Sequence, residues 1–260
     1  MFFQNGVDLY YEVHGQGEPL FLIAGLTAHS GNWPAQLPVF AGKRKTILID
    51  NRNSGRSAVT EDGSVQVMAD DVAALMDHLG IAGADVLGRS MGGYIAQEVA
   101  LRHPLRLRRL ILESTAPVSS VRNNMLFEHF LRLMEANHDQ RAVVGMFFLW
   151  ENSPLLMADS VLFDQALEQA MADPHAQTIQ GFKNQFRAIR SYDTRERLEQ
   201  ISAPSLIIAG AQDLLIPIEE QKTLLEGIPD TRWLCLQGSG HGVHADQAER
   251  FNKAVLDFLA

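Results

Sequence analysis

Short, almost wholly apolar runs recur along this chain, and segments with helical periodicity separate them. Examples are PLFLIAG at 19–25, KTILID at 45–50 and SLIIAG at 205–210. They have the length of strands. They lack the alternation of apolar and polar residues that a strand with one solvent-exposed face shows, so they indicate strands buried on both sides. Such strands with helices between them are typical of a parallel sheet covered on both faces. The pattern predicts an α/β fold with a mostly parallel central sheet, preceded by a hairpin at Asn5-Gly6.

The alternation of strands and helices stops in the middle of the chain. Residues 118–190 have a helical pattern without a clear strand and are rich in large apolar side chains. Strand and helix signals resume afterwards, so residues 1–117 and 191–260 are predicted to form one α/β core. We expect residues 118–190 to form a helical lid inserted over the carboxyl edge of the sheet. A chain of 260 residues is long enough for one core with an insertion.

The net charge and the cysteine content indicate which partners and which cellular compartment to expect. The formal net charge of −9 disfavours nucleic acid and anionic membrane surfaces as partners. Cys235 is the single cysteine, so no intrachain disulfide can form, which fits a reducing cytoplasm. The first residues lack the basic and long apolar segments of a signal peptide, and the apolar runs are too short to span a bilayer. We therefore expect a cytoplasmic protein.

One serine stands in a setting that favours nucleophilic chemistry. Gly88-Arg89-Ser90-Met91-Gly92 has the pattern G-x-S-x-G and lies between a predicted strand and a predicted helix. A serine on such a turn holds its hydroxyl clear of the backbone, and glycines on both sides let the helix and the strand approach. The amino end of the following helix also supplies free N–H groups that favour an oxyanion.

A serine hydroxyl needs a base, and the base candidate is His241. It follows the last predicted strand and stands between Gly240 and Gly242, which indicate a loop. His244 is the rival, although it lies farther from the strand and is also explained as a structural residue. We favour His241.

The base in turn needs an acid that orients it, and the acid candidate is Asp213. It comes soon after the apolar run at 205–210. The alternative is a structural role for this aspartate, in a turn or as a helix cap. Glu113 and Asp50 are rivals, because each also ends a predicted strand. The order Ser90, Asp213, His241 is the order expected for a fold with a nucleophile elbow.

At these residues the chain resembles the α/β-hydrolase superfamily over nearly its whole length. Besides the serine turn, the matching segments are GAQDLLIP at 210–217, GSGHGVHADQAERFN at 238–252 and DNRNSGRS at 50–57. Within the superfamily the chain is most similar to small lidded carboxylesterases, lactonases and enzymes of the enol-lactonase or aminoacrylate-hydrolase kind. The resemblance implies an oxyanion hole made by the backbone N–H groups of Leu26 and Met91.

Three positions depart from the family pattern. Ala24 stands where the family usually has His, Asn53 where it usually has Gly, and Arg89 where His or another residue is commoner. None of them removes Ser90, Asp213 or His241, although Ala24 affects the support of the oxyanion loop. Arg89 and Arg187 could meet a substrate carboxylate, but surface placement is the favoured explanation for each.

The resemblance implies a serine hydrolase that cleaves a small carboxylic ester or lactone. The same triad also supports carbon–carbon hydrolysis or perhydrolysis, and a ligand-binding protein without turnover is the third possibility. Aromatic residues of the insertion are the candidate pocket, although packing of the insertion explains them equally well: Phe127, Phe130, Phe147 and Trp150. No metal-ligand spacing or nucleotide-binding motif occurs, so we expect no metal and no cofactor.

Overall fold

The computed structural model describes all 260 residues and contains one eight-stranded sheet of order β1-β2-β4-β3-β5-β6-β7-β8. Its strands are β1 (Phe2–Gln4), β2 (Asp8–His14), β3 (Pro19–Ile23), β4 (Lys45–Ile49), β5 (Ala84–Arg89), β6 (Leu107–Glu113), β7 (Ser205–Gly210) and β8 (Thr231–Leu236). The predicted α/β class and the mostly parallel sheet are confirmed.

Parallel pairing places the ends of most strands at one edge of the sheet. The sheet contains a parallel set made of β4, β3, β5, β6, β7 and β8. β2 joins this set antiparallel to β4, and β1 pairs antiparallel with β2. The turn between β1 and β2 contains Gly6 with φ +77°, a value that glycine adopts without strain. Since the carboxyl ends of parallel strands share an edge, the loops after β3, β5, β6, β7 and β8 meet there.

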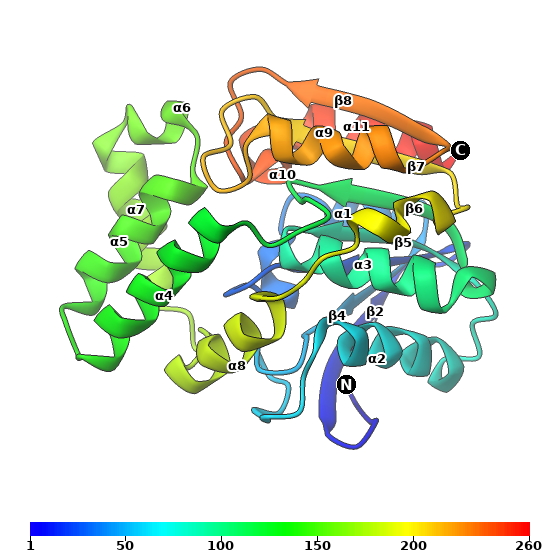
Figure 1. Cartoon of the computed structure of the whole chain (residues 1–260), viewed down its shortest axis with the longest axis horizontal. Helices are drawn as coiled ribbons and strands as arrows, with labels where there is room; N and C mark the ends of the chain where they lie inside the picture. The colour runs from blue at the N-terminus through cyan, green and yellow to red at the C-terminus, as the bar shows by residue number, and fades with distance from the viewer.

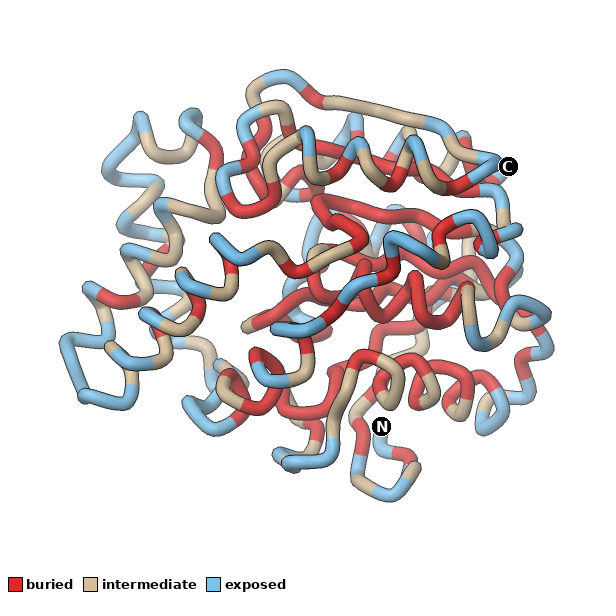
Figure 2. The backbone as a smooth tube through the Cα atoms, viewed as in Figure 1, coloured by how far each residue is buried: buried red, intermediate tan, exposed pale blue.

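Helices cover both faces of the sheet, as continuous apolar strands require. One face packs against α2 (Val65–His78), α3 (Met91–Arg102) and α9 (Ile218–Gly227), and the other against α1 (Leu37–Ala41) and α11 (Ala248–Leu259). The side chains of β3 alternate between these two cores, with Phe21 and Ile23 in one and Leu20 and Leu22 in the other. The sheet is therefore the buried centre of the molecule, as the burial pattern in Figure 2 shows.

Between β6 and β7 the chain forms helices and no strand of the sheet. They are α4 (Val121–Glu135), α5 (Gln140–Glu151), α6 (Pro154–Met157), α7 (Ser160–Met171) and α8 (Ile179–Ile189). Each begins after a side chain that accepts a backbone N–H, namely Ser120, Asp139, Ser153, Asp159 and Thr178. Figure 1 shows α4 to α7 beyond the arrowheads of β6 and β8, at the carboxyl edge of the sheet.

The remaining helical segments are short. They are α10 (Val243–Asp246) and the 3₁₀ turns at Ser30–Asn32, Pro104–Arg106 and Arg195–Gln200. None of the helices combines the length and the apolar composition needed to cross a membrane.

Candidate active site

Ser90 occupies a sharp turn between β5 and α3. Its backbone angles are φ +54° and ψ −119°, in a region that residues other than glycine rarely adopt. A Cβ on Gly88 would lie 2.2 Å from the carbonyl oxygen of Gly92, and one on Gly92 would lie 2.1 Å from the carbonyl oxygen of Ile23. Both glycines are therefore required for the approach of α3 to the strands. The serine between them has the strained strand–turn–helix geometry that the sequence predicts for this segment.

The loop after β3 lies against this serine. A Cβ on Gly25 would come within 3.6 Å of Ser90 Oγ, so the backbone of the loop is directly beside the hydroxyl. The N–H of the next residue, Leu26, donates no backbone hydrogen bond. The N–H of Met91 stands at the first position of α3, where a helix offers no acceptor. Two backbone donors are thus available in the segments that the resemblance implies for an oxyanion hole.

Two departures from the family pattern have local explanations. The amide of Asn51 donates to the carbonyl oxygen of Ala24 at 3.0 Å, so a neighbouring side chain supports the oxyanion loop where the family usually has His. Asn53 has φ +70°, and asparagine tolerates this left-handed conformation better than most residues. Its carbonyl oxygen accepts from Gln177 at 2.8 Å, which ties this loop to the segment before α8.

Asp213 and His241 form a buried pair. Asp213 Oδ2 lies 2.9 Å from His241 Nδ1, and the two residues are 6% and 2% exposed. The other carboxylate oxygen accepts the N–H groups of Leu215 and Ile216, both at 2.9 Å. Asp213 therefore closes a turn and orients the imidazole with the same carboxylate. An Nδ1–H that donates to Asp213 leaves Nε2 of His241 as an acceptor.

The two rival residues pair with each other. Glu113 Oε1 accepts the N–H of His244 at 2.9 Å and lies 2.8 Å from its Nδ1. Burial alone would raise the pKa of Glu113, but the charge and hydrogen bonds of His244 outweigh it and hold the pKa below its ordinary value. The third rival, Asp50, accepts the N–H groups of Ser30 and Arg56 and supports loops elsewhere.

The expectation that Arg89 lies at the surface is wrong. Arg89 is 5% exposed and donates to the carboxylate of Glu151 at the end of α5. Burial would raise the pKa of Glu151, yet Arg89 and then His241 counteract it and hold the pKa below its usual range. The carbonyl oxygen of Glu151 also accepts the N–H of His241 at 3.0 Å. Arg187, in contrast, is exposed as expected.

A second contact, which is partly buried, joins the segment between α7 and α8 to the core. His29 Nε2 lies 2.7 Å from Asp173 Oδ2, and its Nδ1 accepts the N–H of Gly31. His29 is 6% exposed, although nothing near it in the sequence marks it. Sequence reasoning missed Glu151, His29 and Asp173 because their partners are far away along the chain and no local motif accompanies them.

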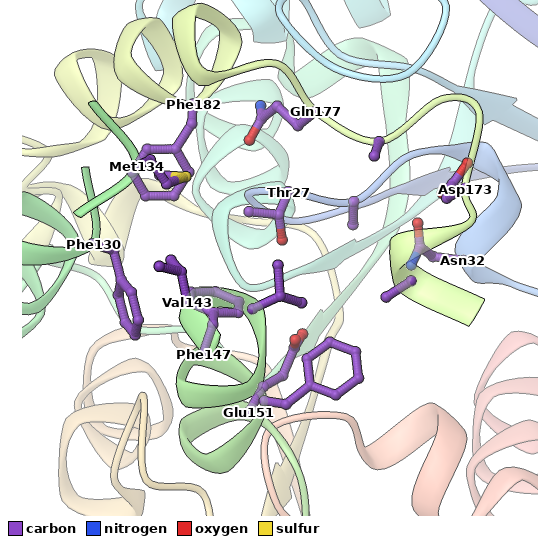
Figure 3. A pocket seen from close by; sticks show the side chains of 15 residues that line it. Thr27, Asn32, Phe130, Met134, Val143, Phe147, Glu151, Asp173, Gln177 and Phe182 are labelled. Atoms are coloured by element: carbon purple, nitrogen blue, oxygen red, sulfur yellow. The ribbon is translucent and has the colours of Figure 1, made fainter. Parts of the chain in front are cut away.

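Two cavities adjoin the serine and the insertion. A small one of about 20 Å³ is lined by Ser90 and by Leu26, Met91, Tyr94, Asn123, Phe127, Ile189, Leu215 and Ile216. A larger one of about 280 Å³ is shown in Figure 3. Of the predicted pocket residues, Phe127 lines the small cavity and Phe130 and Phe147 the large one. Trp150 lines neither, and the guanidinium of Arg122 lies 6.0 Å from its ring.

No three His, Cys, Asp or Glu side chains gather as a metal site would require.

Removing one partner of the Arg89–Glu151 pair should destabilise the fold. Arg89→Met leaves a carboxylate without its cation in a largely buried place, and we expect a loss of about 3 kcal/mol in the free energy of unfolding. The double variant Arg89→Met/Glu151→Leu should recover most of this loss. Urea unfolding measures both, with Arg141→Met in an exposed pair as control. A loss no larger than that of the control contradicts the expectation.

Comparison with known proteins places these features in context. A family model described as "alpha/beta hydrolase fold" matches residues 18–248. A protein of Azorhizobium caulinodans named "Putative carbamate hydrolase RutD" is 32% identical over 254 residues, which cover 96% of this chain and 94% of that protein. The crystal structure of a hydrolase from Pseudomonas aeruginosa PA01 matches with a TM-score of 0.89 at 26% identity, over 100% of this chain and 98% of that one. An enol-lactonase from Burkholderia xenovorans LB400 matches with a TM-score of 0.86 at 24% identity, over 98% and 97%, which shows a shared fold.

Proposed function

This chain is a hydrolase that belongs to the α/β-hydrolase fold family, and we propose that it cleaves small carboxylic esters or lactones through Ser90, His241 and Asp213. The observation that carries the proposal is the buried Asp213–His241 contact at the same sheet edge as a serine held in elbow geometry. The small cavity links them, since Ser90 lines it together with Leu215 and Ile216, whose N–H groups bind Asp213.

The proposed reaction proceeds through an acyl-enzyme. Ser90 Oγ attacks the carbonyl carbon while His241 Nε2 takes the hydroxyl proton, and the carbonyl oxygen becomes an oxyanion. The C–O bond to the leaving alcohol then breaks, and His241 returns the proton to that alcohol. A water molecule attacks the acyl-enzyme with His241 again as base, which releases the acid and restores Ser90. Asp213 holds the imidazole in the tautomer that these steps need.

Backbone donors are proposed to stabilise the oxyanion. The N–H groups of Leu26 and Met91 face no backbone acceptor and flank Ser90. One such donor is worth roughly 3 kcal/mol of activation free energy. Because backbone atoms do this, the identity of the Leu26 side chain is not critical, and the support of Ala24 by Asn51 keeps the loop in place.

A carbamate is the second candidate substrate, because the relative from Azorhizobium caulinodans carries that activity in its name. Esters, lactones and carbamates share a carbonyl that a serine can attack, so the same residues serve all three. Carbon–carbon hydrolysis and perhydrolysis remain alternatives that only a substrate panel separates.

The test is hydrolysis of a p-nitrophenyl ester series from acetate to long acyl chains, followed by lactones and carbamates. We expect the short esters to be cleaved best, since only about 20 Å³ lies beside Ser90. A fluorophosphonate should label Ser90, and peptide mass spectrometry identifies the adduct. An absence of both turnover and labelling would favour a ligand-binding role.

A further inference from the structure

The larger cavity has a composition that selects its ligand. It holds about 280 Å³ between the helical insertion and the loop after β3, and ten of its 15 lining residues are hydrophobic. Among these are Phe130, Met134, Phe147 and Phe182, which Figure 3 shows around the space. An aryl or alkyl group is therefore the main part of any ligand that fills it.

The charged residues of this lining are both carboxylates. They are Glu151 and Asp173, and no Lys, Arg or His lines the cavity. Arg89 lies behind Glu151, is 5% exposed and does not reach the cavity surface. Both oxygens of Asp173 are already used, one by His29 and one by the N–H of His175. An anionic ligand would meet negative charge here and no cation.

Two acceptors at the cavity lack a partner within the protein. Glu151 Oε1 accepts from Arg89, but Oε2 accepts from nothing, and the side chain is 20% exposed. Gln177 donates its Nε2 to the carbonyl oxygen of Asn53 and to Gln185, so its amide orientation is determined. Its Oε1 is buried without any partner. Figure 3 shows Glu151 and Gln177 on opposite sides of the cavity, each with oxygen toward the middle.

The larger cavity adjoins the small one beside Ser90. Thr27 and Ala28 of its lining directly follow Leu26, which lines the small cavity. The ring of Phe127, also in the small cavity, lies 6.4 Å from the ring of Phe147 in the large one. The two cavities are therefore neighbours, and the rings of Phe127 and Phe147 stand between their linings.

We propose that the larger cavity is a subsite for an apolar group that carries a hydrogen-bond donor, a hydroxyl or a protonated amine, which Glu151 and Gln177 accept. The inference rests on the proposed function in one respect: this group is the part of the ester or lactone remote from the scissile carbonyl. Buried acceptors are normally satisfied, and Gln177 Oε1 is satisfied when such a donor binds, while Glu151 Oε2 gains its first partner. A carboxylate-bearing substrate is rejected.

Three ligands that share a phenylbutyl group test the subsite by binding alone: 4-phenylbutylamine, 4-phenylbutan-1-ol and 5-phenylpentanoate. Calorimetric titration of the intact protein with each ligand gives its Kd. We expect the amine to bind at least about tenfold more tightly than the carboxylate, because a hydrogen bond to a charged group is gained in one case and repulsion in the other. Equal binding, or tighter binding of the carboxylate, overturns the proposal.

Variants connect the preference to the two side chains. Glu151→Gln keeps an oxygen for Arg89 but removes the charge. The ratio of the Kd of the carboxylate to the Kd of the amine should therefore fall about tenfold. Gln177→Leu should weaken the alcohol a few-fold relative to the carboxylate, since it removes one neutral hydrogen bond. Glu128→Gln is the matched control, because it removes an equal charge from an exposed position of α4. An unchanged ratio in both test variants overturns the assignment.

Failure of this inference is distinguishable from failure of the proposed function. If esters are hydrolysed but the three ligands bind without preference, the subsite is wrong and the hydrolase chemistry stands. If the amine binds as expected and no ester, lactone or carbamate is cleaved, the subsite stands and the reaction is wrong. Competitive inhibition of p-nitrophenyl acetate hydrolysis by the amine supports both together.

Discussion

Replacement of Ser90 by alanine should lower kcat for ester hydrolysis by about 10⁶, because residues that act as one unit lose nearly all their effect when one is removed. The alanine has no hydroxyl to form the acyl-enzyme, and His241 has no proton to take from it. His241→Ala should cost about as much, since an unactivated serine hydroxyl is a poor nucleophile at neutral pH. Initial rates with p-nitrophenyl acetate at equal protein concentration measure both variants.

A matched serine separates chemistry from folding. Ser205 begins β7, and its hydroxyl donates to the carbonyl oxygen of Ala203, at the opposite end of that strand from the loop of Asp213. Ser205→Ala should therefore retain turnover close to that of the unmodified protein. Near-normal turnover in Ser90→Ala would end the proposal that Ser90 is the nucleophile, provided that its circular dichroism spectrum is unaltered.

Asp213→Asn should lower kcat by about 10⁴, the second largest effect we expect. The amide can donate to His241 Nδ1, which favours the tautomer with its proton on Nε2, so the base cannot accept the serine proton. The amide oxygen of the asparagine stays with the N–H groups of Leu215 and Ile216, so its nitrogen takes the position of Oδ2, 2.9 Å from His241 Nδ1. Steady-state kinetics with the p-nitrophenyl series measure the loss.

Glu113→Gln is the comparison that decides which carboxylate orients the base. Glu113 contacts His244 and not His241, so its loss should reduce kcat far less than that of Asp213. A larger loss in Glu113→Gln than in Asp213→Asn would transfer the role to Glu113.

Acid stability should reveal what Glu113 does instead. Its pKa in the folded protein lies below the ordinary value of 4.5, so its ionised form stabilises the fold above that pH. This contribution disappears as the pH falls through the lowered value. In Glu113→Gln the free energy of unfolding should therefore depend less on pH on the acid side, which urea titrations at several pH values measure.

Local patterns determined much of this protein. Continuous apolar runs predict buried parallel strands because only strands covered on both faces tolerate them. The two glycines around Ser90 predict an elbow because a side chain at either would collide with backbone, as the 2.2 Å and 2.1 Å approaches show. Asp213 and His241 could be chosen because each follows a strand that ends at the same edge, a property readable along the chain.

Tertiary packing alone decided which charged groups meet. The sequence offers Asp213, Glu113 and Asp50 as acids for one histidine, and strand order at the sheet edge assigns Asp213 to His241 and Glu113 to His244. The sequence predicts that Arg89 lies at the surface, but in the structure the end of α5 covers it and Glu151 pairs with it. Such pairs join residues separated by long stretches of chain, and their contacts depend on how the insertion packs on the core. Periodicity and spacing report only local conformation. They therefore do not predict which charged residues far apart in the sequence come into contact.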